Sequence, residues 1–135
     1  MSATATAVCG VWPTARRFVA VVERDGRAGA AASIARTTEA RWGFVAWLSA
    51  SGVYALVTTD ALARDELVAI VREAGIDVWL APAGLVDAVR GAAALTRRGP
   101  RLTAALLARW LHQSALRQNL RLLRAAVDNH QLHLW

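Results

Sequence analysis

The sequence predicts an α/β fold in which a mixed sheet of five strands is flanked by helices. Three observations predict it: short apolar runs suited to strands, a tight-turn sequence between the second and third run, and later runs that alternate with helical patterns. The turn makes the early strands antiparallel, whereas strands joined through helices pair in parallel with right-handed crossovers. A chain of 135 residues that is 56% hydrophobic can bury this core as one domain without a structural metal or disulfide.

Five strands are expected from the apolar runs. The first run suits burial on both faces of a sheet, and the second is β-branched and precedes Asp25-Gly26, which supplies the two positive φ angles of a tight hairpin turn. The third run is weaker and rich in alanine, and the fourth is the clearest buried strand. In chain order the expected strands are Ala7–Val11, Arg17–Glu23, Ala28–Ile34, Val53–Thr58 and Ile76–Ala81.

Capping residues and glycines place the first two helices. A helix is expected over Glu39–Ser49, and the next has its apolar face on Leu67, Ile70 and Val71. Threonine and aspartate are good N-caps, and a glycine just past the last helical turn is a common stop. The expected caps and stops, in chain order, are Thr37 or Thr38, Gly52, Thr59 or Asp60, and Gly75.

The C-terminal third is expected to be helical. Pro82 opens a helix that ends near Ala93, and a basic loop follows at Thr96–Pro100. The pattern from Leu102 to about Val127 is then that of one long helix. The expected organisation is a flexible tail at 1–6, a sheet core at 7–100, a basic amphipathic helix at 101–127 and an unassigned tail at 128–135.

The expected order of elements is β-β-β-α-β-α-β-α-α. A hairpin-led group of three strands, followed by strands alternating with helices, is the ribonuclease H-like arrangement. A flavodoxin-like sheet is the alternative, but such a sheet does not begin with a hairpin of this kind. The sequence therefore predicts a ribonuclease H-like sheet with a long C-terminal helix.

Positive charge is concentrated at the C-terminal end of the chain. The net charge is +6, and every basic residue is an arginine. Residues 1–90 hold nine arginines and nine acids, whereas residues 91–135 hold seven arginines and the single acid Asp128. A GC-rich genome would explain arginine in place of lysine but not the missing acids. Because arginine pairs with phosphate through a bidentate fork, the C-terminal segment favours a polyanionic partner.

The predicted last helix has an apolar side and a largely basic stripe. Three interpretations stand: a helix packed on the sheet with its charges in water, a stripe that follows nucleic-acid phosphates, or a leucine- and tryptophan-rich face that pairs with a second chain. The candidate nucleic-acid contacts are Arg97, Arg98, Arg101, Arg109, Arg117, Arg121 and Arg124. The candidate interface residues are Trp110, Leu116, Leu120 and Leu123.

No membrane span or secretion signal is expected. Trp42–Thr59 is 18 residues long without a charge, close to the length that crosses a bilayer. The Ser49–Gly52 segment interrupts it, however, and its two halves have the patterns of a helix and a strand. The first residues lack the charged and apolar regions of a signal peptide, so we expect a cytoplasmic protein.

Several segments resemble a known family. Val8–Val22, beginning Val-Cys-Gly-Val-Trp-Pro-Thr, resembles the opening strand and hairpin of RuvC-like nuclease domains, and more specifically the N-terminal domain of DEDD-type insertion-sequence transposases. The family pattern there is Gly-Ile-Asp-Val-Ser/Ala-Lys. Val78–Pro82 resembles the family's strand-Asn-Pro segment, and Arg101–Ala108 resembles its closing motif, Thr-Asp-Arg-Ile-Asp-Ala-Arg-Leu-Leu-Ala. The resemblance spans about residues 7–112.

The resemblance also implies that the catalytic acids are missing. In that family four carboxylates hold divalent metal ions for phosphodiester chemistry. The first acid falls on Trp12, the second on Val57 or Thr58, and the closing pair on Pro100 and Thr103. These side chains cannot replace a cage of carboxylate oxygens. We therefore expect no metal and no cofactor.

The remaining acidic, cysteine and histidine residues do not predict a second catalytic or metal site. Asp60 follows the fourth strand and is the one weak candidate for a displaced catalytic acid, although an N-cap is its favoured role. Cys9 is expected to be a buried, inert thiol. His130 and His133 could face one metal, but a surface pair is favoured because no ligand cluster accompanies them.

These observations together predict a RuvC- or transposase-like domain that has lost its catalytic acids. It is expected to bind nucleic-acid backbone without reading sequence, as a dimer. A protein-interaction or oligomerisation module, whose basic face meets an acidic partner, is the first alternative. A divalent-metal-dependent nuclease or transposase with displaced acids around Asp60 is the second.

Overall fold

The computed structural model describes residues 7–82, 84–85, 87–88, 99–112 and 120–123. The strands are β1 (Ala7–Pro13), β2 (Arg17–Arg24), β3 (Arg27–Ala35), β4 (Val53–Thr59), β5 (Asp77–Ala81) and β6 (Arg121–Leu122). The helices are α1 (Thr38–Ala50), the 3-10 turn η1 (Asp60–Leu62), α2 (Glu66–Glu73) and α4 (Gly99–His112). Residues 84, 85, 87 and 88 are also helical, within the helix expected from Pro82 to about Ala93.

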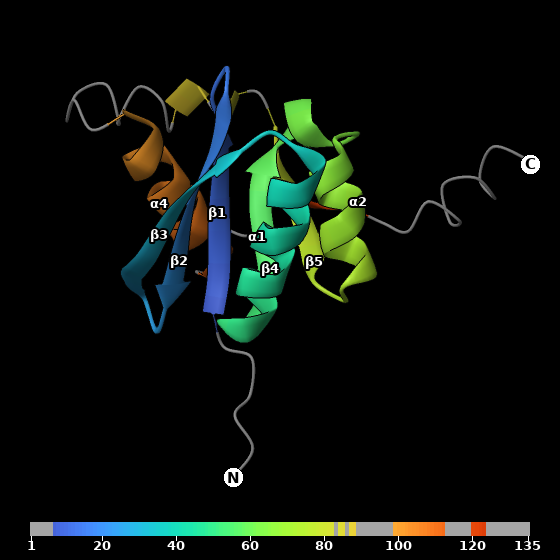
Figure 1. The fold of residues 1–135 in the computed structure, drawn as a ribbon. Helices are drawn as coiled ribbons and strands as arrows, with labels where there is room; N and C mark the ends of the chain where they lie inside the picture. The colour runs from blue at the N-terminus through green and yellow to red at the C-terminus, as the bar shows by residue number, and fades with distance from the viewer. Residues whose placement is uncertain (1–6, 83, 86, 89–98, 113–119, 124–135) are drawn as a thin grey trace, which may run out of the picture.

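The strands form one mixed sheet in the order β3-β2-β1-β4-β5-β6 (Figure 1). β2 pairs antiparallel with both β1 and β3, whereas β1, β4 and β5 run parallel. The mixed sheet is therefore confirmed, with one strand more than expected. The sixth strand, β6, pairs antiparallel with β5 at the edge of the sheet.

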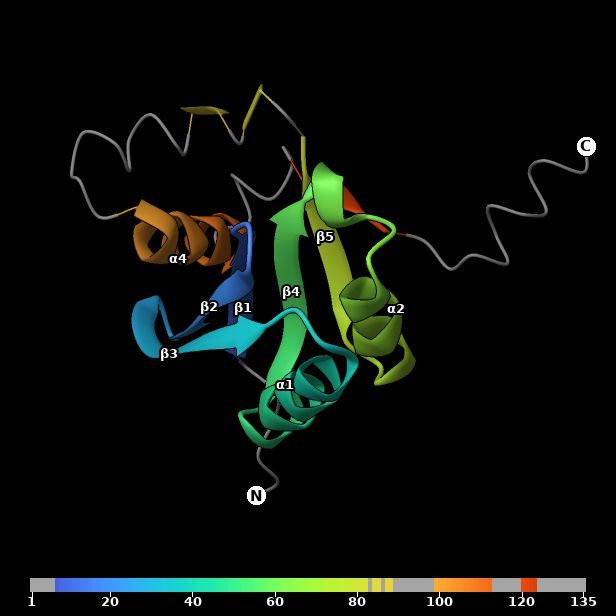
Figure 2. The ribbon, with the colours of Figure 1, turned by 45° about the horizontal axis from the view of Figure 1, so that its top comes forward.

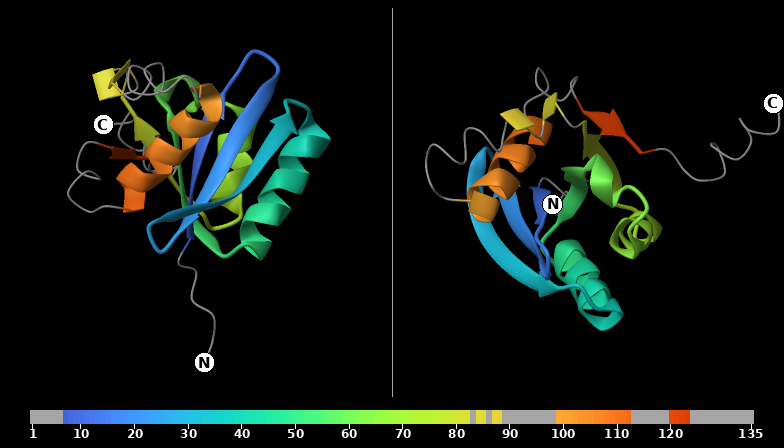
Figure 3. Two further views of the ribbon diagram at one scale, coloured as in Figure 1. Left: turned by 90° about the vertical axis from the view of Figure 1, so that its left-hand side faces the viewer. Right: turned by 90° about the horizontal axis from the view of Figure 1, so that it is seen from above.

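Helices cover both faces of the sheet and make two cores. α1 and α2 lie on one face and α4 on the other, as Figure 2 shows and the two views of Figure 3 repeat. The α1/α2 core buries large side chains such as Phe18, Leu48 and Leu56, and the α4 core is built around Val57 and Leu107. The central strands are therefore apolar on both faces, which explains their nearly continuous hydrophobic sequences.

The predicted hairpin turn between β2 and β3 is confirmed. Asp25 has φ 54° and Gly26 has φ 79°, the two positive values that a type I′ connection needs. The turn sets the register in which Arg24 opposes Arg27 and Phe18 opposes Ile34. β3 forms the outer edge of the sheet on this side, and its first half is exposed.

The N-cap of α2 differs from the expected one. Asp65 caps this helix by accepting a hydrogen bond from Leu67 N–H at 2.8 Å. Thr59 instead caps η1, in which Asp60 is the first residue. The sequence after β4 holds two capping signals in succession, and the short 3-10 turn uses the first. The expected cap of α2 at Thr59 or Asp60 is therefore wrong.

Asp65 also joins α2 to residues before and within α1. Arg41 Nε lies 3.1 Å from Asp65 Oδ1, and Arg36 Nη2 lies 3.8 Å from Oδ2. Burial alone would raise the pKa of Asp65, but hydrogen bonds from Arg41 and Leu67 N–H, together with the two positive charges, hold that pKa below its usual value. The charged carboxylate therefore stabilises the fold above its unfolded-state pKa, and this stabilisation is lost as pH falls through the folded-state pKa.

We expect Asp65→Asn to destabilise the protein more at neutral pH than in acid. Asparagine is an equally good N-cap, so the substitution removes mainly the charge. Urea unfolding should show a loss of about 1–2 kcal/mol at neutral pH that shrinks well below about pH 4, where an ordinary aspartate is protonated. Asp77→Asn, at an exposed position that begins β5, is the matched control. An equal loss at both pH values would contradict this role for Asp65.

The single helix expected from Leu102 to about Val127 is wrong at residues 120–123. α4 begins at Gly99 and is described to His112, but Arg121 and Leu122 form strand β6. Leu122 opposes Trp79 of β5, and Leu123 N–H donates to Val78 O at 2.8 Å. Leucines spaced three or four residues apart fit the period of a helix. In the structure, however, the backbone of residues 121–123 pairs with β5. The rest of the expected helix, at 113–119 and 124–127, lies outside the described residues.

α4 lies directly on the backbone of β1. A Cβ atom at Gly10 would overlap the carbonyl oxygen of Ala104 and lie 2.9 Å from the amide nitrogen of Ala108. Only glycine therefore allows this helix to approach the strand so closely. The expected loop at Thr96–Pro100 also ends earlier than predicted, because Gly99 and Pro100 already belong to α4, where proline suits a first turn.

Within the described segments, every helix is too short or too polar to span a lipid bilayer.

Candidate functional site

Three parallel strands end at one edge of the sheet and frame a cavity there. The carboxyl ends of β1, β4 and β5 lie at the same end of the sheet. We call this end the carboxyl edge, as distinct from the lateral edges formed by β3 and β6. The cavity has a volume of about 320 Å³. Its described lining residues are Trp12, Pro13, Thr59, Asp60, Ala61, Ala81 and Asp87. In open sheets with parallel strands, ligands commonly bind beyond the carboxyl ends of the strands, so this cavity is the candidate functional site.

Trp12 lies in the sheet at this edge. β1 extends to Pro13, two residues beyond its expected end, so that Trp12 is a strand residue opposite Val19 of β2. Its indole is partly buried and packs against the α4 core. The position where the resembling family has its first aspartate therefore holds an aromatic wall of the cavity.

Of the residues at the end of β4, Thr59 lines the cavity. The two residues that the resemblance placed at the second acid are buried elsewhere: Val57 packs in the α4 core, and the Thr58 hydroxyl donates to Val11 O at 3.0 Å. Because Gly10 opposes Val57, the period of two brings Thr59 to the same face as Trp12. Sequence reasoning missed Thr59 by ending this strand one residue early.

The residues at the expected closing acids, Pro100 and Thr103, are not among the described residues that line the cavity. Pro100 is exposed in the first turn of α4. Thr103 is buried, and its hydroxyl donates to Gly99 O at 3.0 Å. The hydroxyl of Thr103 is therefore occupied by the helix backbone.

Two carboxylates line the cavity, and one of them is bound by an arginine. Asp60 Oδ1 lies 2.9 Å from Arg121 Nη2, and both side chains are largely exposed. Asp87 is exposed and also lines the cavity. Sequence reasoning missed it at this site because no local signal shows that the segment after β5 folds back over the strand ends.

This set of groups does not fit a divalent metal ion. Mg²⁺ and Mn²⁺ need several oxygen ligands, chiefly carboxylates, around one point. At the carboxyl edge the strand positions supply an indole and a threonine, and a guanidinium already holds Asp60. Among the described residues, no three histidine, cysteine, aspartate or glutamate side chains gather closely enough to hold one ion.

The structure does not place the C-terminal arginines on one stripe. Arg101 and Arg109 are exposed on α4, whereas Arg121 is exposed on β6 at the edge of the sheet. Arg109 Nε lies 3.9 Å from Oε2 of the buried Glu23, so this arginine faces β2. The other candidates, Arg97, Arg98, Arg117 and Arg124, lie outside the described residues.

Arg101 lines a second and larger hollow. This groove has a volume of about 590 Å³ and lies between the β2–β3 hairpin and the first turns of α4. Its described lining residues are Val21, Ala28, Gly29, Arg101, Leu102 and Ala105. Small side chains on β3, such as Ala28 and Gly29, leave this space open beside Arg101.

The candidate interface residues serve largely as packing within the chain. Leu120 is buried in the α4 core, and the partly buried Trp110 packs against that core. Leu123 packs against the core on the opposite face. Leu116 lies outside the described residues. Part of the apolar surface that we expected to contact a partner is therefore buried within this chain.

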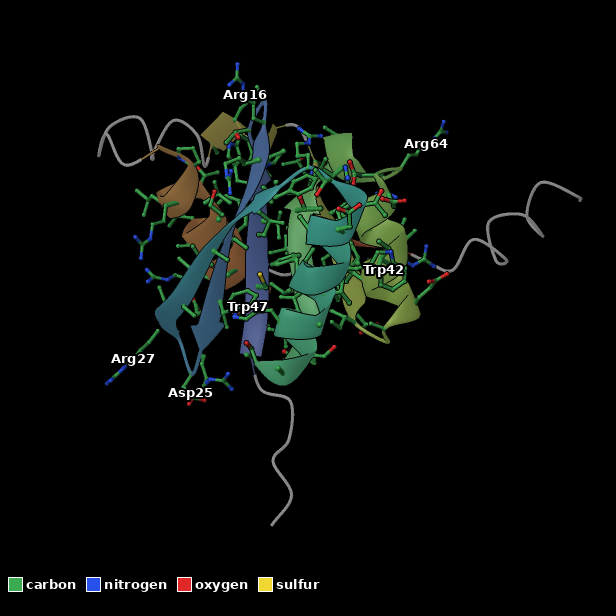
Figure 4. All side chains as sticks on the ribbon, viewed as in Figure 1. Arg16, Asp25, Arg27, Trp42, Trp47 and Arg64 are labelled. Carbon is green, nitrogen blue, oxygen red and sulfur yellow. The ribbon has the colours of Figure 1, made fainter. Side chains whose placement is uncertain are left out.

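Arg16 is a basic residue that the sequence analysis did not single out. It lies in the turn between β1 and β2, beyond the carboxyl end of β1. Figure 4 shows its side chain projecting from this end of the sheet, opposite to the end that carries Asp25 and Arg27. Only the hairpin geometry identifies it, since nothing in its local sequence distinguishes it from the other arginines.

Cys9 is buried between β2 and β4 in the α1/α2 core, as expected. Burial raises the pKa of its thiol far above the usual value, so the thiol stays protonated at neutral pH. We expect the native protein to resist Ellman's reagent and the urea-unfolded protein to react at once. Rapid reaction of the native protein would show that this core opens.

The comparisons with known proteins support the architecture. Neither a family model nor a curated protein sequence matches the chain. Among solved structures, the chain is similar to T. thermophilus RuvC in complex with a Holliday junction substrate. The superposition has a TM-score of 0.60 at 16% sequence identity and covers 87% of this chain and 99% of that chain. At this identity the likeness concerns the fold alone: the chain has a ribonuclease H-like fold.

Proposed function

We propose that this chain is a domain that binds the sugar–phosphate backbone of nucleic acids without cleaving it. The observation that carries the proposal is the Arg121–Asp60 ion pair at the rim of the carboxyl-edge cavity. There the resemblance implies carboxylates that hold metal ions, and this chain instead presents a guanidinium. An arginine at that position favours a phosphate oxygen and disfavours a metal cation.

Charge along the sequence supports the same function. The segment from residue 91 onward holds seven arginines against one acid, and it supplies the net charge of +6. Of these arginines, Arg101, Arg109 and Arg121 are exposed in the structure, and Arg16 adds a further cation at the carboxyl edge. The similar RuvC structure contains a Holliday junction, which supports a branched or duplex DNA as the partner. The likeness to transposase domains stays a prediction.

A gel shift with a DNA duplex at two salt concentrations tests the proposal. Because backbone contacts release counterions, binding at about 50 mM salt should weaken steeply by about 200 mM. The complex should form equally with duplexes of unrelated sequence. Absence of a shift at the lower salt concentration would contradict the proposal.

One observation favours a second candidate, a metal-dependent nuclease with displaced acids. Asp60 and Asp87 both line the carboxyl-edge cavity. Incubation of supercoiled plasmid with Mn²⁺ separates this candidate from the first. We expect intact plasmid with the wild-type protein, whereas nicking that is lost in Asp60→Asn would favour the nuclease.

The proposal includes a dimer, and this part is tested separately. Trp42, a residue of α1 labelled in Figure 4, is 52% exposed. Exposed tryptophans are common anchors at protein interfaces. Light scattering of the wild type should give twice the mass of one chain. Trp42→Ala should lower the measured mass to that of one chain. A stable oligomer that does not bind DNA would favour the protein-interaction module instead.

A further inference from the structure

We infer that the carboxyl-edge cavity accepts a single unpaired nucleobase, stacked on the Trp12 indole. This inference rests on the proposed function, because it assigns the cavity to a base while the arginines contact the backbone. It adds a structural preference to an otherwise non-specific interaction: nucleic acid with an extruded or unpaired base should bind more tightly than a continuous duplex.

The walls of the cavity suit a flat aromatic ring. Trp12, Pro13, Ala61 and Ala81 give it apolar sides, and the volume is about 320 Å³. Stacking of a base on an aromatic side chain is favourable and tolerates different bases, because every base has a π-face. A phosphate group would find few polar partners against these sides, so the backbone is a poorer occupant than a base.

The polar groups of the cavity are mostly hydrogen-bond acceptors. Carboxylates of Asp60 and Asp87 line it together with the Thr59 hydroxyl, which can both donate and accept. Asp60 accepts from Arg121 through Oδ1, and an ionised carboxylate has room for further donors. Adenine, cytosine and guanine carry amino groups that donate, whereas thymine has none. The cavity should therefore prefer an amino-bearing base to thymine.

Arg121 is placed to hold the phosphate next to such a base. Its side chain is 61% exposed and lies beside the cavity through its contact with Asp60. A guanidinium has five N–H donors, so the contact with Asp60 leaves others for a phosphate oxygen. The same residue thus links the base cavity to backbone binding. A base that is already unpaired enters most readily, because it needs no duplex opening.

The test compares a duplex that carries one bulged 2-aminopurine with the same duplex without the bulge. We expect the wild-type protein to bind the bulged duplex about tenfold more tightly and to quench 2-aminopurine fluorescence as the base stacks on the indole. Trp12→Ala should remove the preference and the quenching but keep salt-dependent binding to the plain duplex. Tyr54→Ala, which removes an exposed aromatic ring of β4 that is not among the described lining residues of the cavity, is the matched control and should keep both effects.

Two further variants keep the test decisive if Trp12→Ala fails to fold. Trp12→Phe keeps an apolar ring in β1 and should quench more weakly than the wild type. Asp87→Ala changes an exposed residue and should bind bulged cytosine and bulged thymine alike, whereas the wild type should prefer cytosine. Equal wild-type affinity for bulged and plain duplexes would overturn the inference and leave backbone binding standing. Absence of binding to either duplex would overturn the proposed function and this inference with it.

Discussion

Gly10→Ala is expected to abolish stable folding or to detach α4 from the sheet. The added methyl group would overlap Ala104 O and lie 2.9 Å from Ala108 N, and both are backbone atoms that no side-chain rotation can move. To make room, α4 must shift away from β1 and open the core around Leu107 and Leu111. We expect a loss of more than about 4 kcal/mol, in the range reserved for severe steric conflicts.

Urea unfolding and hydrogen exchange of α4 measure this effect. Gly43→Ala is the matched control, because a Cβ at Gly43 meets nothing within 4 Å and the residue lies in α1. That substitution should stabilise the protein by about 0.5–1 kcal/mol through helix propensity. If Gly10→Ala folds with wild-type stability and protection, α4 does not rest on β1, and the carboxyl edge described here is wrong.

The combined substitution of Arg117, Arg121 and Arg124 by alanine is expected to weaken binding to duplex DNA at least about tenfold. Each phosphate contact adds close to one unit to the slope of log K against log salt, so the slope should fall by about three. Fluorescence anisotropy over a range of salt concentrations measures both quantities. The fold should persist, because the exposed Arg121–Asp60 pair contributes little to stability.

A second triple variant distinguishes the effect of where the arginines lie from the effect of the total charge on DNA binding. Alanine at Arg27, Arg64 and Arg72 lowers the net charge of +6 by the same three units but changes the start of β3, the segment before α2 and the last turn of α2. This control should bind DNA with nearly the wild-type slope. If the two triple variants weaken binding equally, overall charge and not the C-terminal segment is responsible.

The central strands could be predicted from sequence, whereas the edges of the sheet could not. β1, β2 and β4 have nearly continuous apolar sequences because both of their faces are largely buried, and Asp25-Gly26 identified the hairpin turn. β6 has only two residues and depends on pairing with β5, which no local pattern indicates. The spacing of Leu116, Leu120 and Leu123 fits the period of a helix, and a strand of two residues is too short to show a period of its own.

Sequence could identify Trp12 and Asp60 at the candidate site, but not Thr59 and Asp87. Trp12 could be placed because the resemblance puts the family's first aspartate there, although the expected strand ended at Val11. Thr59 reaches the cavity through the register between β1 and β4, and Asp87 reaches it through the path of the chain after β5. Both depend on tertiary structure, as does the pairing of Arg121 with Asp60 across 61 residues of sequence.

We propose that the carboxyl edge, with Trp12 and the Arg121–Asp60 pair at its cavity, binds no divalent metal ion. Titration of Mn²⁺ into the protein–duplex complex, with free Mn²⁺ followed by electron paramagnetic resonance, tests it most directly. The account predicts identical, weak and non-saturating curves for the wild type and for the Asp60→Asn/Asp87→Asn variant, with the duplex intact in both. A saturable stoichiometric site in the wild type that disappears in the double variant would contradict it.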